Sequence, residues 1–285
     1  MPTLPSDSTE ALLRPLSDAI AADREFPPLE GSEYMRSHVA FEAASDQQER
    51  IRAWLRGRLL EHPGPRVDVA SVGAGSGILD VPLIEAVSAH RELRYHVVEP
   101  VEAQCEALKR RAEAQLGDDR AVDLSVECAP VEELIPSRTF DFVLAIHSTY
   151  YFADLPAALD TLLAMVRPGG RLLLGIAPRE EMNRLAELFW SSQVDEPLQF
   201  EPELRALLSE RVRALSVERI DARLTIAQHD HALEDVASFL IQTPLDALEP
   251  SLRAGVLDYL HAVGETRASG ELEIPHPVSM IEARR

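Results

Sequence analysis

The feature that most constrains this chain is a run of glycines between a predicted strand and a predicted helix. Residues 67–72 have the pattern of a buried strand, and Gly73, Gly75 and Gly77 follow at once. Glycine at such positions lets the backbone approach a ligand closely and leaves N–H groups at a helix start to bind it. Glu99 ends the next predicted strand, 22 residues after Gly77 (99 − 77), where a carboxylate can accept both hydroxyls of an adenosine ribose. Together these features predict a cofactor that contains adenosine.

The chain beyond the glycines repeats the same alternation of strand and helix. Predicted strands cover 95–98, 122–128, 140–146 and 171–177, and amphipathic helices lie near 101–116 and 154–166. This alternation predicts a parallel sheet with helices on both faces. Outside this region we predict helices over 33–61, 180–191, 233–241 and 251–263, and strands over 212–226 and 272–282.

Charge and composition exclude several kinds of partner. Acidic residues outnumber basic ones 48 to 28, which gives a formal net charge of −20. Such a surface repels nucleic acids and anionic lipids. No apolar run approaches the length of a membrane span, and residues 1–10 do not resemble a signal peptide. Cys105 and Cys128 have no metal-ligand spacing and give little support to a disulfide framework. We therefore expect a cytoplasmic protein with a small-molecule substrate and neither nucleic acid nor membrane as partner; the oligomeric state stays open.

The glycine spacing distinguishes between classes of adenosine cofactor. The dinucleotide fingerprint has glycine at the sixth position of the turn, where this chain has Ile78. The Gly-Lys-Ser/Thr sequence of a P-loop is absent. Gly-x-Gly-x-Gly with Glu99 downstream, the strand at 140–146 and the Arg-Pro-Gly-Gly turn at 167–170 resemble class I S-adenosylmethionine-dependent methyltransferases. This resemblance implies S-adenosylmethionine as cofactor and S-adenosylhomocysteine as product.

A closer resemblance is to histamine N-methyltransferase and its relatives. Residues 71–80, 97–100 and 150–151 carry it, together with the N-terminal run from Tyr34 to Asp46. The cofactor-binding residues expected from the turn and from this resemblance are Gly73, Ala74, Gly75, Gly77, Glu99, Pro100, Gln104, Pro130, Val131 and Ile146. The expected substrate-binding residues are Tyr34, His38, Phe41, Asp46, His147, Tyr150 and Tyr151, and His147 and Tyr150 are also the catalytic candidates.

His147 departs from the family pattern, because a glutamine that contacts the substrate stands there in the relatives. It ends a predicted strand, and ligands of parallel sheets bind at the carboxyl ends of strands. His147 or an ordered water could accept a proton from the acceptor, although a strong base is not obligatory. Pro130 stands where many methyltransferases have an acid that faces adenine. No aspartate–asparagine cluster suggests a Mg²⁺ site, so we expect no metal.

We therefore expect an α/β fold with a Rossmann-like seven-stranded methyltransferase sheet and helices on both faces. The expected divisions are a helical cap or lid at 1–62, the cofactor-binding core at 63–226, a helical substrate-side insertion at 227–270 and the last strand at 271–285. The expected activity is methylation of an amine or heteroaromatic nitrogen. A carbon- or oxygen-methyltransferase of a biosynthetic pathway and a non-catalytic binding module remain alternatives, and a nicotinamide-dependent oxidoreductase is disfavoured by Ile78.

Overall fold

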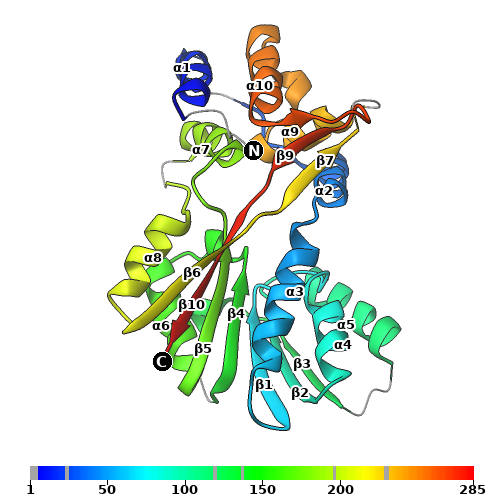
Figure 1. The fold of residues 1–285 in the computed structure, drawn as a ribbon, viewed down its shortest axis with the longest axis vertical. Coiled ribbons are helices and arrows are strands. Elements are labelled where there is room, and N and C mark those ends of the chain that lie inside the picture. The colour runs from blue at the N-terminus through cyan, green and yellow to red at the C-terminus, as the bar shows by residue number, and fades with distance from the viewer. Residues whose placement is uncertain (1–5, 23–25, 118–120, 136–137, 195–196, 228–230) are drawn as a thin grey trace. The chain divides into compact units, whose positions relative to one another are not determined.

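The computed structural model of the chain describes residues 6–22, 26–117, 121–135, 138–194, 197–227 and 231–285. The chain gathers into two compact units (Figure 1). Unit 1 contains residues 1–47, 178–198 and 221–277, and unit 2 contains residues 48–177, 199–220 and 278–285. The chain therefore passes from one unit to the other at 47/48, 177/178, 198/199, 220/221 and 277/278.

A seven-stranded sheet in the order β3-β2-β1-β4-β5-β10-β6 forms the centre of unit 2. Its strands are β1 (Arg66–Val72), β2 (Glu92–Val98), β3 (Val122–Glu127), β4 (Phe140–Ile146), β5 (Val166–Ile176), β6 (Ala214–Ile220) and β10 (Val278–Arg284). Strands β1 to β5 run parallel, and β10 runs antiparallel to β5 and β6. The strand order reverses between β1 and β4, which is where open parallel sheets bind ligands. The expected Rossmann-like sheet is confirmed.

Helices cover both faces of this sheet because the apolar strand residues alternate in direction. Val69 and Leu144 pack on one face with Leu55, while Ala70 and Val143 pack on the other. The first face carries α3 (Gln47–Leu60), α4 (Asp80–Ser88) and α5 (Glu102–Leu116), and the second carries α6 (Leu155–Met165) and α8 (Glu201–Ser209). A fully buried valine or leucine side chain contributes about 1.5–3 kcal/mol to the free energy of unfolding. Burial of such side chains therefore holds the helices on both faces against the sheet.

Unit 1 combines helices from three stretches of the chain with a small sheet. Its helices are α1 (Ser6–Ala22), α2 (Gly31–Ala44), α7 (Met182–Gln193), α9 (Ala232–Ile241) and α10 (Pro250–Val263), and short 3₁₀ turn η3 (Leu245–Ala247) follows α9. Its strands β7 (Arg223–Ile226), β8 (Glu265–Thr266) and β9 (Leu272–Pro275) pair in the order β7-β9-β8. One apolar core, which includes Leu16, Phe41, Phe189 and Tyr259, joins these elements.

Several predicted elements are divided in the structure. The strands predicted over 212–226 and 272–282 each form two strands, one in each unit's sheet: β6 then β7, and β9 then β10 (Figure 1). The breaks fall at 221–222 and 276–277, and the second contains a proline, which cannot donate a ladder hydrogen bond. The helix predicted over 33–61 is also divided, because α2 and α3 are separated by residues 45–46, where Ser45 has extended backbone and bridges Leu224.

The two units do not follow the expected divisions residue by residue. Residues 48–62, which the sequence analysis grouped with the cap, cluster with the sheet of unit 2, and residues 178–198, grouped with the core, cluster with unit 1. Residues 228–230 of the expected insertion lie outside the described residues. The division into cap, core and insertion stays a prediction.

The two cysteines are paired, against the expectation from sequence. Cys105 in α5 and Cys128 after β3 form a disulfide, with Cα atoms 6.4 Å apart. The pairing depends on the parallel register of β2 and β3, which brings the start of α5 and the end of β3 together, and no cysteine spacing reveals that.

Among the described residues, no helix is long and apolar enough to cross a membrane.

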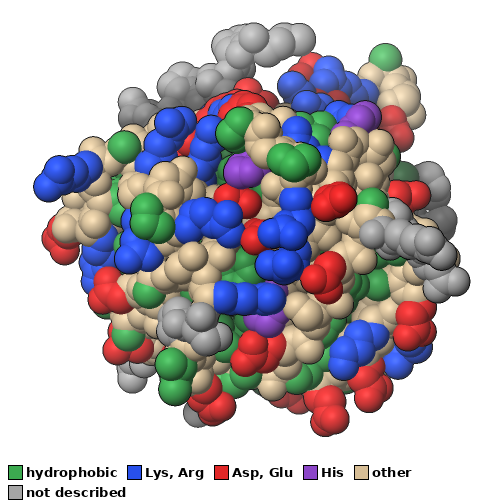
Figure 2. Space-filling model, turned by 90° about the horizontal axis from the view of Figure 1, so that it is seen from below, with side chains coloured by type: hydrophobic (Ala, Val, Ile, Leu, Met, Phe, Trp, Pro, Cys, Tyr) green, Lys and Arg blue, Asp and Glu red, His purple; other side chains and the backbone are tan. Residues whose placement is uncertain are grey.

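Arginine side chains gather with carboxylates on the face of the molecule shown in Figure 2. At the amino-terminal ends of β1 and β4, the buried Asp68 pairs with Arg66 at 3.2 Å and with Arg167 at 3.0 Å. Arg167 also contacts Asp141 at 2.9 Å. These arginines are neutralised by carboxylates of unit 2, so they hold the strand ends together instead of forming a bare basic surface.

Candidate functional site

The glycine turn after β1 has a backbone that only glycine adopts easily. Gly73, Gly75 and Gly77 have φ values of 75°, 54° and 74°. The N–H of Gly73 donates to the Val98 carbonyl at 2.8 Å, which fixes the turn against β2. A Cβ on Gly73 would lie 2.3 Å from the Cβ of Ser148, whereas one on Gly75 would meet no atom within 4 Å. The turn is therefore packed at its base and open at Gly75, where a ligand can approach the backbone.

Glu99 lies at the end of β2, opposite the turn. Its side chain is 5% exposed. The N–H of Gly75 donates to Oε2 at 2.8 Å, and the N–H of Val101 donates to Oε1 at 3.1 Å. Each carboxylate oxygen has a second lone pair, so Glu99 can hold the turn and still accept hydroxyl groups of a ligand.

A buried polar pair beneath the turn was missed by the sequence analysis. The hydroxyl of Tyr95 donates to Asp80 Oδ1 at 2.6 Å, and both side chains are buried. Burial raises the pKa of Asp80, the first residue of α4, and burial together with the Asp80 charge raises the pKa of Tyr95. The signal available was an aspartate three residues after Gly77, but its partner on β2 could not be identified without the strand register.

The remaining predicted cofactor residues lie at the carboxyl ends of the same parallel strands. They are Ala74 in the turn, Pro100 and Gln104 after β2, Pro130 and Val131 after β3, and Ile146 at the end of β4. Gln104 and Pro100 are exposed, and Ala74, Pro130 and Ile146 are partly buried. The Val131 side chain is buried in the core, so only its backbone can contact a ligand.

His147 and Tyr150 follow β4 and face each other. Their rings stack at 6.2 Å with an interplanar angle of 16°, and His147 Nδ1 lies 3.4 Å from Tyr150 Oη. The N–H of Ala177 donates to the same hydroxyl at 2.7 Å. Burial lowers the pKa of His147 to about 4 and raises that of Tyr150 well above its usual value. At neutral pH the pair is therefore an uncharged imidazole beside a protonated phenol.

His147 also has an unusual backbone, with φ of 51°. Its N–H donates to the Gly175 carbonyl at 2.8 Å, so β4 and β5 hold the residue in this conformation. Non-glycine residues in the left-handed region occur preferentially at functional sites. Tyr151, the next aromatic in the same turn (η2, Thr149–Tyr151), is 80% exposed and meets Tyr150 edge-on at 6.3 Å.

Three of the predicted substrate residues form an aromatic cluster within unit 1. Tyr34 and His38 stack at 5.8 Å on α2. Phe41 lies 4.7 Å from Phe239 of α9 and 5.1 Å from His276. Phe239 and His276 join this cluster from about 200 and 235 residues beyond Phe41, so local sequence patterns do not reveal them.

Two acidic residues near this cluster, Asp46 and Glu42, have different partners. Asp46, the acid that the family resemblance implies, accepts the N–H of Arg223 at Oδ1 at 2.7 Å and so helps to fix β7. Glu42 was not predicted; it lies on α2 one turn after His38, with 3.9 Å between Oε1 and His38 Nε2. Burial raises the pKa of Glu42.

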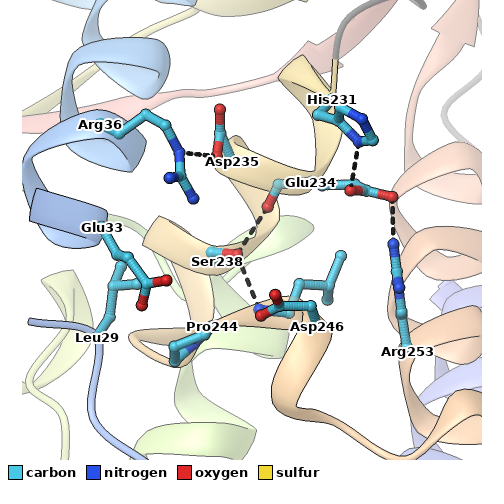
Figure 3. A pocket seen from close by; sticks show the side chains of 11 residues that line it. Leu29, Glu33, Arg36, His231, Glu234, Asp235, Ser238, Pro244, Asp246 and Arg253 are labelled. Atoms are coloured by element: carbon cyan, nitrogen blue, oxygen red, sulfur yellow. Dashed lines mark hydrogen bonds and ion pairs between the residues drawn. The ribbon is translucent and has the colours of Figure 1, made fainter.

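A cavity of about 520 Å³ lies within unit 1, between α2, α9, η3 and α10 (Figure 3). Its walls are charged: Arg36 pairs with Asp235 at 2.9 Å, and Glu234 pairs with both Arg253 and His231. None of the predicted cofactor or substrate residues lines it. This cavity is therefore distinct from the predicted cofactor and substrate residues.

In the part of the chain that the structure describes, no group of three or more His, Cys, Asp or Glu side chains is placed to hold a metal ion. The expectation of a metal-independent site stays a prediction.

Comparisons with known proteins identify the family. A family model described as a methyltransferase domain matches residues 41–210. The chain is 28% identical over 118 residues to histamine N-methyltransferase of Xenopus tropicalis, covering 38% of this chain. It is 25% identical over 120 residues to the highly reducing polyketide synthase pkhB of Emericella nidulans, covering 40% of this chain. The chain spans only 40% of the length of the histamine N-methyltransferase and 5% of the length of the polyketide synthase.

Among solved structures, the YcgJ protein from Bacillus subtilis has a similar fold. The TM-score is 0.56 at 17% sequence identity, and the match covers 82% of this chain and 97% of that one.

Proposed function

This chain belongs to the methyltransferase domain family, and from that membership we propose that it transfers the methyl group of S-adenosylmethionine to a nitrogen of a small molecule, either an amine or a heteroaromatic ring. The observation that carries the proposal is the contact between the Gly75 N–H and Glu99 at 2.8 Å. It joins the open part of the glycine turn to a buried carboxylate, the arrangement that a nucleoside with two ribose hydroxyls requires.

The residues present fit this cofactor. The space at Gly75 is one that a Cβ would partly fill, and Glu99 keeps lone pairs for the ribose. Pro100, Gln104, Pro130 and the backbone of Val131 would flank the adenine and ribose, with Ile146 and the turn near the amino-acid part. When bound, S-adenosylmethionine supplies a methyl group on a positively charged sulfur that a lone pair can attack.

The protein's own task is then to hold the acceptor and to exclude water. Positioning of two reactants can supply about 7–11 kcal/mol of a barrier, so no strong acid or base is needed. We propose that His147, Tyr150 and Tyr151 of unit 2 contact the acceptor; the substrate roles expected for Tyr34, His38, Phe41 and Asp46 stay a prediction. Aromatic faces attract cationic groups by about 0.5–2 kcal/mol each, and the net charge of −20 does not oppose a cationic acceptor.

Nitrogen as the methyl acceptor atom is favoured by the similarity to histamine N-methyltransferase and by the uncharged His147–Tyr150 pair. The alternative is a carbon or oxygen acceptor in a biosynthetic pathway, which the similarity to a polyketide synthase supports. A non-catalytic binding module would also keep the turn and Glu99, and only turnover distinguishes it.

The test combines binding with turnover. We expect S-adenosylhomocysteine, but not NAD, to raise the melting temperature, since a ligand at 100 times its Kd stabilises by about 2.7 kcal/mol. Labelled S-adenosylmethionine is then incubated with a panel of amines, indoles and phenols, and the methylated atom is found by mass spectrometry. Label on oxygen or carbon would refute nitrogen transfer, and binding without turnover on any acceptor would favour the non-catalytic module.

A further inference from the structure

The loop between β4 and α6 (residues 147–154, the β4–α6 loop) carries the three side chains that we propose to contact the methyl acceptor. It ends at Asp154, which caps α6 by accepting the N–H of Ala157 at 3.0 Å. Its first residue is fixed to β5, because the N–H of His147 donates to the Gly175 carbonyl at 2.8 Å. Two further hydrogen bonds join the same loop to segments in which cofactor residues are predicted.

Ser148 joins the β4–α6 loop to the glycine turn. Its side chain is 5% exposed, and its hydroxyl donates to the carbonyl of Val72, the last residue of β1, at 2.9 Å. A Cβ on Gly73 would lie only 2.3 Å from the Cβ of Ser148, so the loop packs directly against the base of the turn. Because packed interiors leave little free space, a change in the backbone of the turn also affects the loop.

Glu132 joins the other end of the β4–α6 loop to the chain that follows β3. Its Oε1 accepts the N–H of Ala153 at 2.9 Å. Glu132 comes directly after Pro130 and Val131, which are predicted to flank the adenine, and the Val131 side chain is buried in the core. A hydrogen bond to a charged acceptor is stronger than one between neutral groups. Both ends of the loop are therefore bonded to segments that the cofactor is proposed to contact.

We infer that Ser148 and Glu132 are positioning residues that couple the cofactor site to the β4–α6 loop, so that cofactor binding orders the loop and raises the affinity for the acceptor. The inference deepens the proposed function and rests on it for the identity of the cofactor. Neither side chain needs to contact a ligand. When a first ligand stiffens a shared segment, the second ligand loses less conformational entropy on binding. Such a coupling changes affinity by about 5- to 150-fold, and it is reciprocal between the two ligands.

The chain offers a matched control beside each of these two residues. Thr149 follows Ser148 and is also buried, but within the described part of the chain its hydroxyl has no hydrogen-bond partner. Glu133 follows Glu132 in the short turn η1 (Val131–Glu133), and both glutamates are exposed. Thr149→Val and Glu133→Ala therefore remove the same chemical groups as Ser148→Ala and Glu132→Ala without breaking either bond to the loop.

The first experiment needs no acceptor. Hydrogen–deuterium exchange of the peptide that covers residues 147–154 is measured on the full chain with and without saturating S-adenosylhomocysteine. We expect the ligand to slow exchange by about 5- to 150-fold in the unmodified protein and in both control variants. Ser148→Ala and Glu132→Ala should each reduce this slowing at least about threefold, the loss expected for one hydrogen bond.

Two results of this experiment would overturn the inference: no slowing in the unmodified protein that has bound S-adenosylhomocysteine, or equal slowing in Ser148→Ala, Glu132→Ala and the controls. Circular dichroism shows whether each variant is folded. Glu132 is exposed, so Glu132→Ala keeps the test decisive even if the buried Ser148→Ala does not fold.

The second experiment measures turnover of the best acceptor of the panel. Ser148→Ala and Glu132→Ala should each raise the KM for the acceptor about 3- to 10-fold, with kcat within about threefold and the Kd of S-adenosylhomocysteine within about twofold. Glu132→Gln should restore most of the loss, because its amide oxygen still accepts the Ala153 N–H. Weaker S-adenosylhomocysteine binding in both Glu132 variants would show that its charge acts on the cofactor instead, and the inference would be wrong.

Failure of the proposed function is distinguishable from failure of this inference. A protein that does not bind S-adenosylhomocysteine refutes the proposed cofactor, and the coupling is refuted with it. A protein that binds S-adenosylhomocysteine but methylates no acceptor refutes the proposed transfer, while exchange of residues 147–154 still decides whether the cofactor site and the loop are coupled.

Discussion

Removing the charge of Glu99 tests the cofactor site most directly. Glutamine has almost the same shape, but one carboxylate oxygen becomes an NH₂ group that faces a backbone N–H, either that of Gly75 or that of Val101. A hydrogen bond to a charged acceptor is worth about 1.5–3 kcal/mol. Loss of one such bond to a ribose hydroxyl therefore weakens S-adenosylhomocysteine binding by about 10- to 150-fold.

The same substitution affects folding less severely. An amide placed against a backbone donor costs about 1–3 kcal/mol, which is below the 5–15 kcal/mol of a typical domain. We therefore expect Glu99→Gln to remain folded by circular dichroism, with a lower melting temperature. Glu102→Gln is the matched control, because it removes the same charge three residues later from an exposed position in the first turn of α5. Calorimetry that finds the Kd of folded Glu99→Gln within twofold of the unmodified protein would refute the assignment of Glu99 to the ribose.

The other predictions concern the turn, His147 after β4 and the disulfide. Gly75→Val should abolish S-adenosylhomocysteine binding in calorimetry at a cost of about 1–2 kcal/mol in stability, since its side chain meets only open space but its φ is positive. Gly73→Ala should destabilise more, by about 2–4 kcal/mol in denaturant unfolding, because its Cβ would lie 2.3 Å from a neighbouring side chain; equal losses in the two variants would contradict this packing. His147 has a folded pKa of about 4 against 6.5 in the unfolded chain, so the unfolded state binds more protons between these values. Stability should therefore fall as pH falls through that window, by about 2 kcal/mol between pH 7 and pH 5, and His147→Gln should remove this contribution, which urea titrations of both proteins can check. Reducing the bond between Cys105 and Cys128 should lower the unfolding free energy by about 3 kcal/mol; an unchanged unfolding curve with dithiothreitol, matched by Cys128→Ser, would show that the bond does not contribute.

The parts of the fold that sequence predicts well are those with local signals. The strand before Gly73, the turn itself and Glu99 lie within about 30 residues, and each has a periodicity or a residue type that physical rules connect to structure. Three of the five parallel strands were placed within one residue of their ends for the same reason, whereas β2 begins three residues and β5 five residues before the predicted strands. Because parallel strands end at one edge, these local predictions also brought the predicted cofactor residues together.

The parts that sequence could not predict depend on long-range pairing. The partner of Asp80 is Tyr95 on the neighbouring strand, and the partner of Phe41 is Phe239 on a helix about 200 residues away. The division of the strand predicted over 212–226 follows from two different neighbours, β10 and β9, for its two halves. Periodicity identifies a strand but does not name its neighbour.

The way in which the chain passes back and forth between the units has a consequence for its synthesis. Leu16 of α1 packs close to Gly255 of α10, where an added Cβ would lie 2.7 Å from the leucine side chain. The ribosome adds Gly255 239 residues after Leu16 (255 − 16), which takes about 12–50 s at roughly 5–20 residues per second. During that time the apolar faces of α1 and α2 emerge without the segments that cover them in the finished protein. The nascent chain is therefore expected to keep these faces uncovered until its synthesis is nearly complete, and the sheet of unit 2 also waits for β10, its last strand in sequence, which lies between β5 and β6.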